Sequence, residues 1–122
     1  MIDAFGGART IRASDKAKSY MKHLETVGLF KEQGDVWRLG ASLGILTGNK
    51  LEGVGGGTFQ NINSLDPDGI LAAIMVGIYP DMDPEERLKL LISYAEWGIK
   101  DIFRQYEIGT LDFSKLGLFG EM

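Results

Sequence analysis

A glycine-rich stretch is the first part of the sequence whose residue types could bind a phosphate. The segment GNKLEGVGGGTF, residues 48–59, places Lys50 ahead of four closely spaced glycines. A Walker loop has Gly-Lys-Ser/Thr at the start of a helix, and a dinucleotide fingerprint has G-x-G-x-x-G between a strand and a helix. Neither spacing is present, so we interpret the stretch as a flexible connection. A nucleotide-binding enzyme that uses Lys50 and Gly55–Gly57 is the third hypothesis, after the two developed below.

The remaining polar side chains show no catalytic or metal-binding pattern. The chain has no cysteine, and its single histidine, His23, has no second histidine with which to share a metal ion. The acidic cluster at residues 81–86 lacks the spacing and the glycine of a calcium loop, and helix capping explains it. None of the serines lies in the context of a nucleophile elbow. The sequence therefore predicts a protein that is not an enzyme and needs neither cofactor nor metal.

A basic cluster near the N-terminus is the other candidate for binding chemistry. Five cationic side chains fall within fourteen residues, namely Arg9, Arg12, Lys16, Lys18 and Lys22. The segment RTIRAS, residues 9–14, is typical of a short strand, and a strand followed by two helices is the order of ribbon-helix-helix proteins. In those proteins paired strands enter the major groove, and on this hypothesis Arg9, Arg12 and Lys16 contact DNA. The alternative, which we favour, is a solvated basic helix face.

Charge is distributed unevenly along the chain. Residues 1–50 carry eight Lys/Arg and five Asp/Glu, a balance of +3, whereas residues 51–122 carry five and twelve, a balance of −7. The sum is the net charge of −4. An acidic second half would repel DNA unless it faced away from it, while the first half still offers a local basic patch.

Length and composition predict one soluble domain. The 122 residues, 44% of them hydrophobic and 25% charged, match one globular domain that needs no disulfide. No apolar run approaches the length that spans a bilayer, and residues 1–14 lack the pattern of a secretory signal. We expect a cytoplasmic protein that does not act at a membrane.

Hydrophobic periodicity predicts about four helices that would position these residues. Apolar residues recur at helical spacing from Lys16 to about Val27, with Ser14 or Asp15 as the N-cap and Gly28 at the C-terminal end. Residues 1–8 have no such pattern and are expected to be mobile. The N-terminal basic cluster would thus lie on a short strand and on the first helix.

A second predicted helix is rich in small residues. It begins at Val36, with Asp35 as its cap, and Gly40, Ala41 and Gly44 lie among its apolar side chains. Glycine is unfavourable inside a helix, but small residues allow another backbone to approach closely. We expect this helix to be central, and Gly40, Ala41 and Gly44 are candidates for the interface of a homodimer.

Two further helices follow the glycine-rich stretch. Asp66 and Pro67 form a typical start for a short buried helix that ends before Pro80. The segment DMDPEER then predicts a capping box and a long helix from Pro84 to about Glu107. Gly98 is expected to bend that helix, and Gly109 to end it.

The last residues are unusually apolar for a tail. Leu111, Phe113, Leu116, Leu118 and Phe119 fall within residues 109–122. Such side chains are expected to dock on the chain's own core, or on a neighbouring subunit as the second choice. Phe113 and Phe119 are therefore further candidates for the interface of a homo-oligomer.

The order of these features resembles one family. It is carried by GLFKEQGDVWRLGASLGILTGNK (residues 28–50), FQNINSLDPDGILAAIMVG (59–77) and ERLKLLISYAEWGIKDIFRQY (86–106). Residues 10–107 resemble the small accessory proteins associated with DNA phosphorothioation (Dnd) systems of prokaryotes. The resemblance implies a role beside DNA modification or restriction, in defence against phage. It implies no active site, so it transfers no functional residues.

Together, these observations predict one mainly α-helical domain, residues 1–122, with about four helices and room for one short N-terminal strand. We expect a non-enzymatic accessory or adaptor protein of a prokaryotic DNA-modification or restriction system. Its partners would be proteins of that system, with DNA as a further possible partner. The alternative is a ribbon-helix-helix DNA-binding regulator that uses the basic N-terminal segment.

Overall fold

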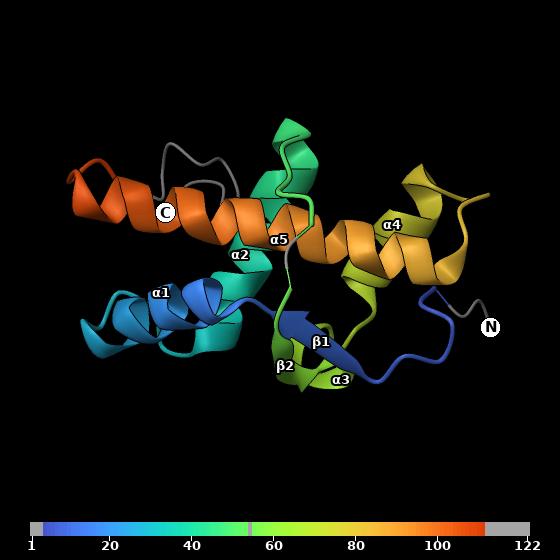
Figure 1. The fold of residues 1–122 in the computed structure, drawn as a ribbon, viewed down its shortest axis with the longest axis horizontal. Coiled ribbons are helices and arrows are strands. Elements are labelled where there is room, and N and C mark those ends of the chain that lie inside the picture. The colour runs from blue at the N-terminus through green and yellow to red at the C-terminus, as the bar shows by residue number, and fades with distance from the viewer. Residues whose placement is uncertain (1–3, 54, 112–122) are drawn as a thin grey trace.

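The computed structural model describes residues 4–53 and 55–111, which form five helices and two strands (Figure 1). In chain order the elements are β1 (Thr10–Ala13), α1 (Asp15–Thr26), α2 (Gln33–Thr47), β2 (Gly57–Asn61), α3 (Ile62–Leu65), α4 (Ile70–Ile78) and α5 (Pro84–Glu107). Four helices are substantial and α3 is a single turn. The predicted mainly helical domain with an N-terminal strand is confirmed.

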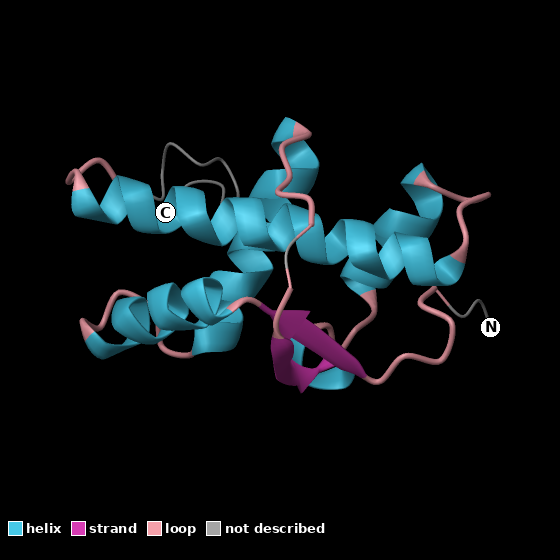
Figure 2. Ribbon diagram, in the orientation of Figure 1, coloured by secondary structure: helices cyan, strands magenta, loops and turns pink. Residues whose placement is uncertain are grey.

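Helix α5 is the longest element, and the other elements pack along it. Its 24 residues rise about 36 Å at 1.5 Å per residue. Figure 1 shows α2 crossing the middle of α5, α1 near the C-terminal half of α5 and α4 near its N-terminal half. The two strands form one short antiparallel ribbon among these helices (Figure 2). None of the described helices is long and apolar enough to cross a membrane.

Glycines bring the backbones of α2 and α5 into contact where the helices cross. A Cβ atom built on Gly98 of α5 would lie 1.9 Å from the carbonyl oxygen of Gly40 in α2. A Cβ atom on Gly44 would lie 2.4 Å from the carbonyl oxygen of Tyr94. No side chain fits at such distances, so these positions must be glycine for the helices to approach this closely. Gly98 is therefore needed for the close contact between α2 and α5.

The proposed dimer interface through α2 is occupied within the chain. Gly40, Ala41 and Gly44 are buried, and the two glycines face α5 of the same chain. The small residues of α2 predicted a close backbone neighbour, and that neighbour is the segment 94–99 of the same chain. A second copy would have to use another surface. The other two interface candidates, Phe113 and Phe119, lie outside the described residues.

The starts of the helices agree with the prediction in part. The hydroxyl of Ser14 accepts a hydrogen bond of 3.0 Å from the backbone N–H of Ala17, so the predicted cap of α1 is confirmed. Helix α2 begins at Gln33, three residues before the predicted start. Asp35 therefore lies inside its first turn and pairs with Arg38 instead of capping.

The capping motifs of α4 and α5 differ from their prediction. Asp66 does cap α4, through hydrogen bonds from the N–H groups of Leu71 and Ala72, but the helix begins only at Ile70. Helix α5 has the predicted bounds, yet Asp83 makes no side-chain cap and Glu86 pairs with Lys89. The predicted capping box is thus absent, and proline at the first position starts the helix.

The N-terminal segment is held by a buried arginine. Arg87 is 4% exposed, and its guanidinium donates hydrogen bonds to four carbonyl oxygens. These belong to Ala4, Tyr79, Pro80 and Met82. Ala4 and Phe5 are themselves buried in the core. The expected mobility of residues 1–8 is therefore wrong for Ala4 and Phe5, and residues 1–3 lie outside the described part.

Two tyrosines link the end of α4 to α5. The hydroxyl groups of Tyr79 and Tyr94 form a hydrogen bond, and Tyr94 is buried. Burial, followed by the hydrogen bond and the charge of Tyr79, raises the pKa of Tyr94 from 10.0 to about 12. The folded state therefore favours the protonated form of the Tyr94 hydroxyl.

The glycine crossing predicts a large effect of adding one methyl group. Gly98→Ala is expected to lower the free energy of unfolding by about 2 kcal/mol or more, because the methyl group overlaps the backbone of α2. Gly77→Ala in α4 is the matched control, because no atom lies within 4 Å of its Cβ position. It should raise stability by about 1 kcal/mol through helix propensity. Urea denaturation measures both, and equal effects would contradict the crossing geometry.

The tyrosine pair predicts a loss of stability at alkaline pH. The folded pKa of Tyr94 lies above the unfolded value of 10.0, so the folded state holds this proton more tightly. Its contribution is fully present below pH 10 and is lost as pH rises toward 12. Chemical denaturation at several alkaline pH values should show that the free energy of unfolding falls less steeply with pH in Tyr94→Phe than in the natural chain. A decline of the same steepness in both proteins would argue against the raised pKa.

Candidate nucleic-acid interface

Strand β1 finds its partner inside the chain. It pairs antiparallel with β2, with Arg12 opposite Thr58 and a register irregularity between Ile11 and Arg12. The strand–helix–helix order of a ribbon-helix-helix protein is present, but β2 occupies the position that a second copy's strand takes in that family. The ribbon that such a protein inserts into DNA is therefore an intrachain ribbon here.

The glycine-rich stretch explains how β2 reaches β1. Gly56 has φ +144, and a Cβ atom on it would lie 2.1 Å from the carbonyl oxygen of Ala13. Only glycine permits this approach. Lys50, at the other end of the stretch, lies 3.1 Å from Glu52 in an exposed ion pair. The stretch thus leads the chain from α2 to the edge of β1.

A buried carboxylate fixes the junction between β1 and α1. Glu96 of α5 is 5% exposed and accepts hydrogen bonds from both the backbone N–H (3.0 Å) and the hydroxyl (2.6 Å) of Ser14. Ser14 in turn caps α1. The alternating burial of β1, with Ile11 and Ala13 inside, then leaves Arg12 exposed on the outer face.

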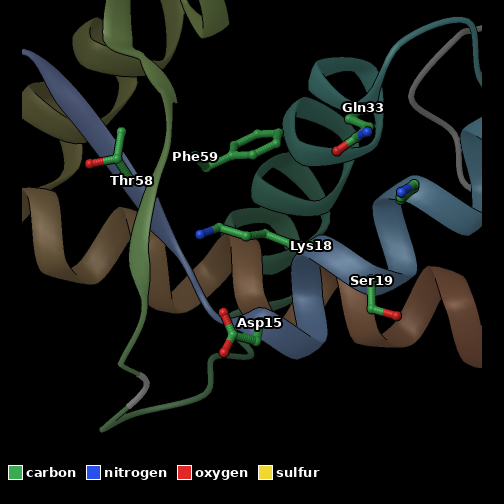
Figure 3. Close-up of a pocket in the computed structure, with 7 residues that line it drawn as sticks. Asp15, Lys18, Ser19, Gln33, Thr58 and Phe59 are labelled. Atoms are coloured by element: carbon green, nitrogen blue, oxygen red, sulfur yellow. The ribbon is translucent and has the colours of Figure 1, made fainter.

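A groove lies between α1 and β2 on this outer face. It encloses about 420 Å³ and is lined by Asp15, Lys18, Ser19, Lys22, Gln33, Thr58 and Phe59. Figure 3 shows Lys18 extending from α1 toward β2, with the ring of Phe59 between β2 and α2. Lys18 and Lys22 are four residues apart, so their side chains are neighbours on one face of the helix. The groove combines two cations with a partly exposed aromatic ring.

The three predicted DNA contacts are not among the residues that line the groove. Arg9, Arg12 and Lys16 are all exposed. Arg12 pairs in the sheet with Thr58, which lines the groove, and Lys16 follows Asp15, which also lines it. Arg9 precedes the far end of β1. The structure therefore places Arg12 and Lys16 next to residues of the groove and Arg9 at the other end of the strand.

Sequence analysis placed Lys18 and Lys22 in the basic cluster but did not select them as contacts. The signal was their four-residue spacing, which puts them on the same face as Asp15 and Ser19. The deciding information was the position of β2, whose Phe59 closes the other side of the groove. A strand that follows a glycine-rich connection cannot be assigned to a partner from its own residues alone.

The cations of the N-terminal cluster have no partner in the described part of the chain. No hydrogen bond or ion pair within residues 4–53 and 55–111 involves the side chains of Arg9, Arg12, Lys16, Lys18 and Lys22. By contrast, Arg38, Lys89 and Arg104 each pair with a carboxylate on their own helix. No carboxylate in the described ranges therefore neutralises the cations of the N-terminal cluster at short range.

His23 and the acidic residues form no metal site in the described ranges. His23 is exposed, and its Nε2 atom lies 3.3 Å from the hydroxyl of Tyr106. Its ring packs edge-on against Phe103, which also stacks on Tyr20 at a centroid distance of 4.2 Å. No three His, Asp or Glu side chains among these residues are grouped to hold a metal ion. The histidine is thus part of an aromatic contact between α1 and α5.

Comparison of the chain with protein-family models, with curated proteins and with solved structures finds no match.

The junction that presents the basic cluster is predicted to depend on Ser14. Ser14→Ala removes the cap of α1 and one of the two hydrogen bonds to buried Glu96. A lost cap alone costs about 1 kcal/mol, and an under-satisfied buried carboxylate adds to it, so we expect a loss of about 2 kcal/mol. Chemical denaturation measures it, with Ser19→Ala, exposed on the same helix, as the control. Similar stability of the two variants would show that the junction contributes little.

Proposed function

We propose that the chain is a non-enzymatic accessory protein of a prokaryotic DNA-modification or restriction system and that it contacts nucleic acid through the groove between α1 and β2. The observation that carries this proposal is the pair Lys18 and Lys22, whose ammonium groups have no partner among residues 4–53 and 55–111, beside the partly exposed ring of Phe59. The resemblance supports the cellular context, and the groove supports the contact.

The chemistry of the groove suits a phosphate backbone. Lysine binds phosphate as a mobile point charge, and two lysines about one helical turn apart can neutralise neighbouring phosphates. Arg12 adds a third cation beyond Thr58. Asp15, at one end of the groove, would repel phosphate there and so limit the contact to the side of Lys22. Counterion release from the phosphates would then drive association.

The groove favours a single strand over a duplex. An aromatic ring beside cations is the usual surface on which an unpaired base stacks. Gln33, the amide that could read a base edge, already donates a hydrogen bond of 3.1 Å to Glu25. We therefore expect binding with little sequence preference, through phosphates and one stacked base.

The alternative is a direct DNA-binding regulator that uses Arg9, Arg12 and Lys16. It is less favoured because β1 already has an intrachain partner and because these three cations do not gather at one place. It would also require a dimer whose strands pair across the two copies. A dimer that binds a DNA duplex with a steep dependence of affinity on salt, and that loses this binding in Arg9→Gln, would support the alternative.

The groove predicts a salt-dependent affinity that depends on two lysines. The variant Lys18→Gln with Lys22→Gln should lower the slope of log affinity against log salt for a single-stranded oligonucleotide by about 1.4, or about 0.7 for each lost phosphate contact. Fluorescence anisotropy with a labelled strand, from low to physiological salt, measures it. Lys100→Gln is the matched control, since Lys100 is exposed on α5 and lines neither groove wall. An unchanged slope in the double variant would refute the proposal.

A further inference from the structure

One face of α4 is apolar and exposed along its whole length. Helix α4 contains no charged residue, and its buried side chains are Leu71 and Met75. The residues on the opposite side are all exposed and recur at helical spacing, namely Ile70, Ala73, Ile74, Gly77 and Ile78. We call these five residues the α4 face. Its three isoleucines are 60%, 39% and 52% exposed. The prediction of a buried helix is therefore wrong for this face.

Single exposed apolar residues are ordinary, but a contiguous row of them is typical of an interaction surface. Of the other large exposed apolar side chains in the described ranges, Val27 and Leu29 lie in the turn after α1, and Leu46 and Ile108 lie singly on or beside other elements. In the α4 face, by contrast, three isoleucines lie one helical turn apart. A partner could cover them together with one helix.

Gly77 adds an independent reason for a close partner. It lies inside α4, where glycine is less favourable than any other residue except proline. Its backbone is not in the left-handed region, and nothing lies within 4 Å of its Cβ position. The fold thus has no need for glycine here. Because Gly77 has no side chain, a large side chain of a partner can approach the backbone of α4 between Ile74 and Ile78.

Carboxylates flank the α4 face at both ends. Asp68 precedes the helix, and Asp81, Asp83 and Glu85 follow it in the loop and at the start of α5. All four residues are exposed, and none of their side-chain carboxylates takes part in a hydrogen bond or ion pair in the described part of the chain. A partner with positive charge at both ends would satisfy them.

A hollow continues the α4 face toward α2. It encloses about 450 Å³, and Ile70 and Asp68 line it together with Glu32, Arg38, Ser42, Ser64, Leu65, Asp66, Pro67 and Leu71. Its one cation, Arg38, is already paired with Asp35. The hollow is therefore net negative and would accept a lysine or arginine side chain.

A second copy of the chain suits this surface poorly. If two α4 faces met around a two-fold axis, parallel or antiparallel, the carboxylates at the helix ends would lie beside those of the other copy. Like charges brought together in this way are destabilising. The chain's own segment 112–122 has Lys115 as its single cation, against Asp112 and Glu121, and so offers no complementary charge.

We propose that the α4 face binds a basic amphipathic helix of a protein partner. Large aliphatic side chains of that helix cover the isoleucines and approach the backbone at Gly77. Lysine or arginine residues at its ends contact Asp68 and the hollow at one end, and Asp81 and Asp83 at the other. This is the helix-in-groove mode of recognition, with charge fixing the direction and the class of partner. The inference does not depend on the nucleic-acid groove.

A pair of labelled peptides tests the proposal. Both are helical peptides of about five turns with leucines at three- and four-residue spacing, and one carries lysines and the other glutamates at both ends. Fluorescence anisotropy should show the basic peptide binding at least tenfold more tightly than the acidic one. Ile74→Gln and Gly77→Gln should each lower the affinity for the basic peptide at least fivefold. The double variant Asp68→Asn with Asp81→Asn should remove the preference between the peptides.

Matched controls separate this surface from the others. Leu46→Gln changes an isoleucine-sized side chain that is 66% exposed on α2, and it should leave the affinity unchanged. Lys18→Gln, in the groove, should also leave the affinity for the basic peptide unchanged. The peptide test therefore does not depend on the nucleic-acid proposal. Circular dichroism and thermal melting confirm that each variant is folded.

Three results would overturn the proposal. Equal affinity for the two peptides would remove the charge argument. A dimer that Ile74→Gln converts to a monomer, measured by light scattering, would assign the α4 face to a second copy. Stronger peptide binding by Leu116→Ser with Phe119→Ser would assign the face to the chain's own C-terminal segment.

Discussion

The backbone contact between α2 and α5 is the constraint on which the remaining structure depends. Gly40, Gly44 and Gly98 let two helices meet without intervening side chains. Trp37 of α2 and Ile99 of α5, close to these glycines in the chain, are fully buried in the core. The contact also commits the apolar surface of α2 to its own chain. The two candidate binding surfaces, the groove between α1 and β2 and the α4 face, lie mainly on other elements.

Two buried polar side chains of α5 then determine what those surfaces present. Glu96 holds the N-terminal end of α1 through Ser14, and Arg87 gathers the carbonyl groups of Ala4 and of the turn after α4. Both are charged groups that would be costly in the core without these hydrogen bonds. One anchor lies beside the basic groove, and the other lies at the end of α4. The long helix thus fixes both candidate binding surfaces through specific, nearly fully buried contacts.

Local patterns were sufficient to predict the helices, but not their neighbours. Pro84 and Gly109 set the bounds of α5 because proline and glycine act on their own backbone, and Ser14 caps α1 for the same local reason. The small residues of α2 indicated a close neighbour, yet they could not show that it was α5. Lys18 and Lys22 likewise gained their meaning only when β2 was placed beside α1. Contacts between distant segments depend on the whole fold, and one sequence does not encode them in any short pattern.

The separation of charge along the chain becomes a separation in space. The basic cluster lies on β1 and α1, whereas the unpaired carboxylates lie around α4 and the start of α5, and Figure 1 shows these regions on different parts of the molecule. A chain of net charge −4 would be a poor ligand for nucleic acid if its charges were mixed evenly. Salt screens charges beyond about 8 Å, so carboxylates on another part of the molecule weaken the field of Lys18 and Lys22 less than neighbouring carboxylates would. The two contacts proposed above would therefore use separate surfaces of opposite charge, so that a basic partner at the α4 face would not compete with a ligand in the groove.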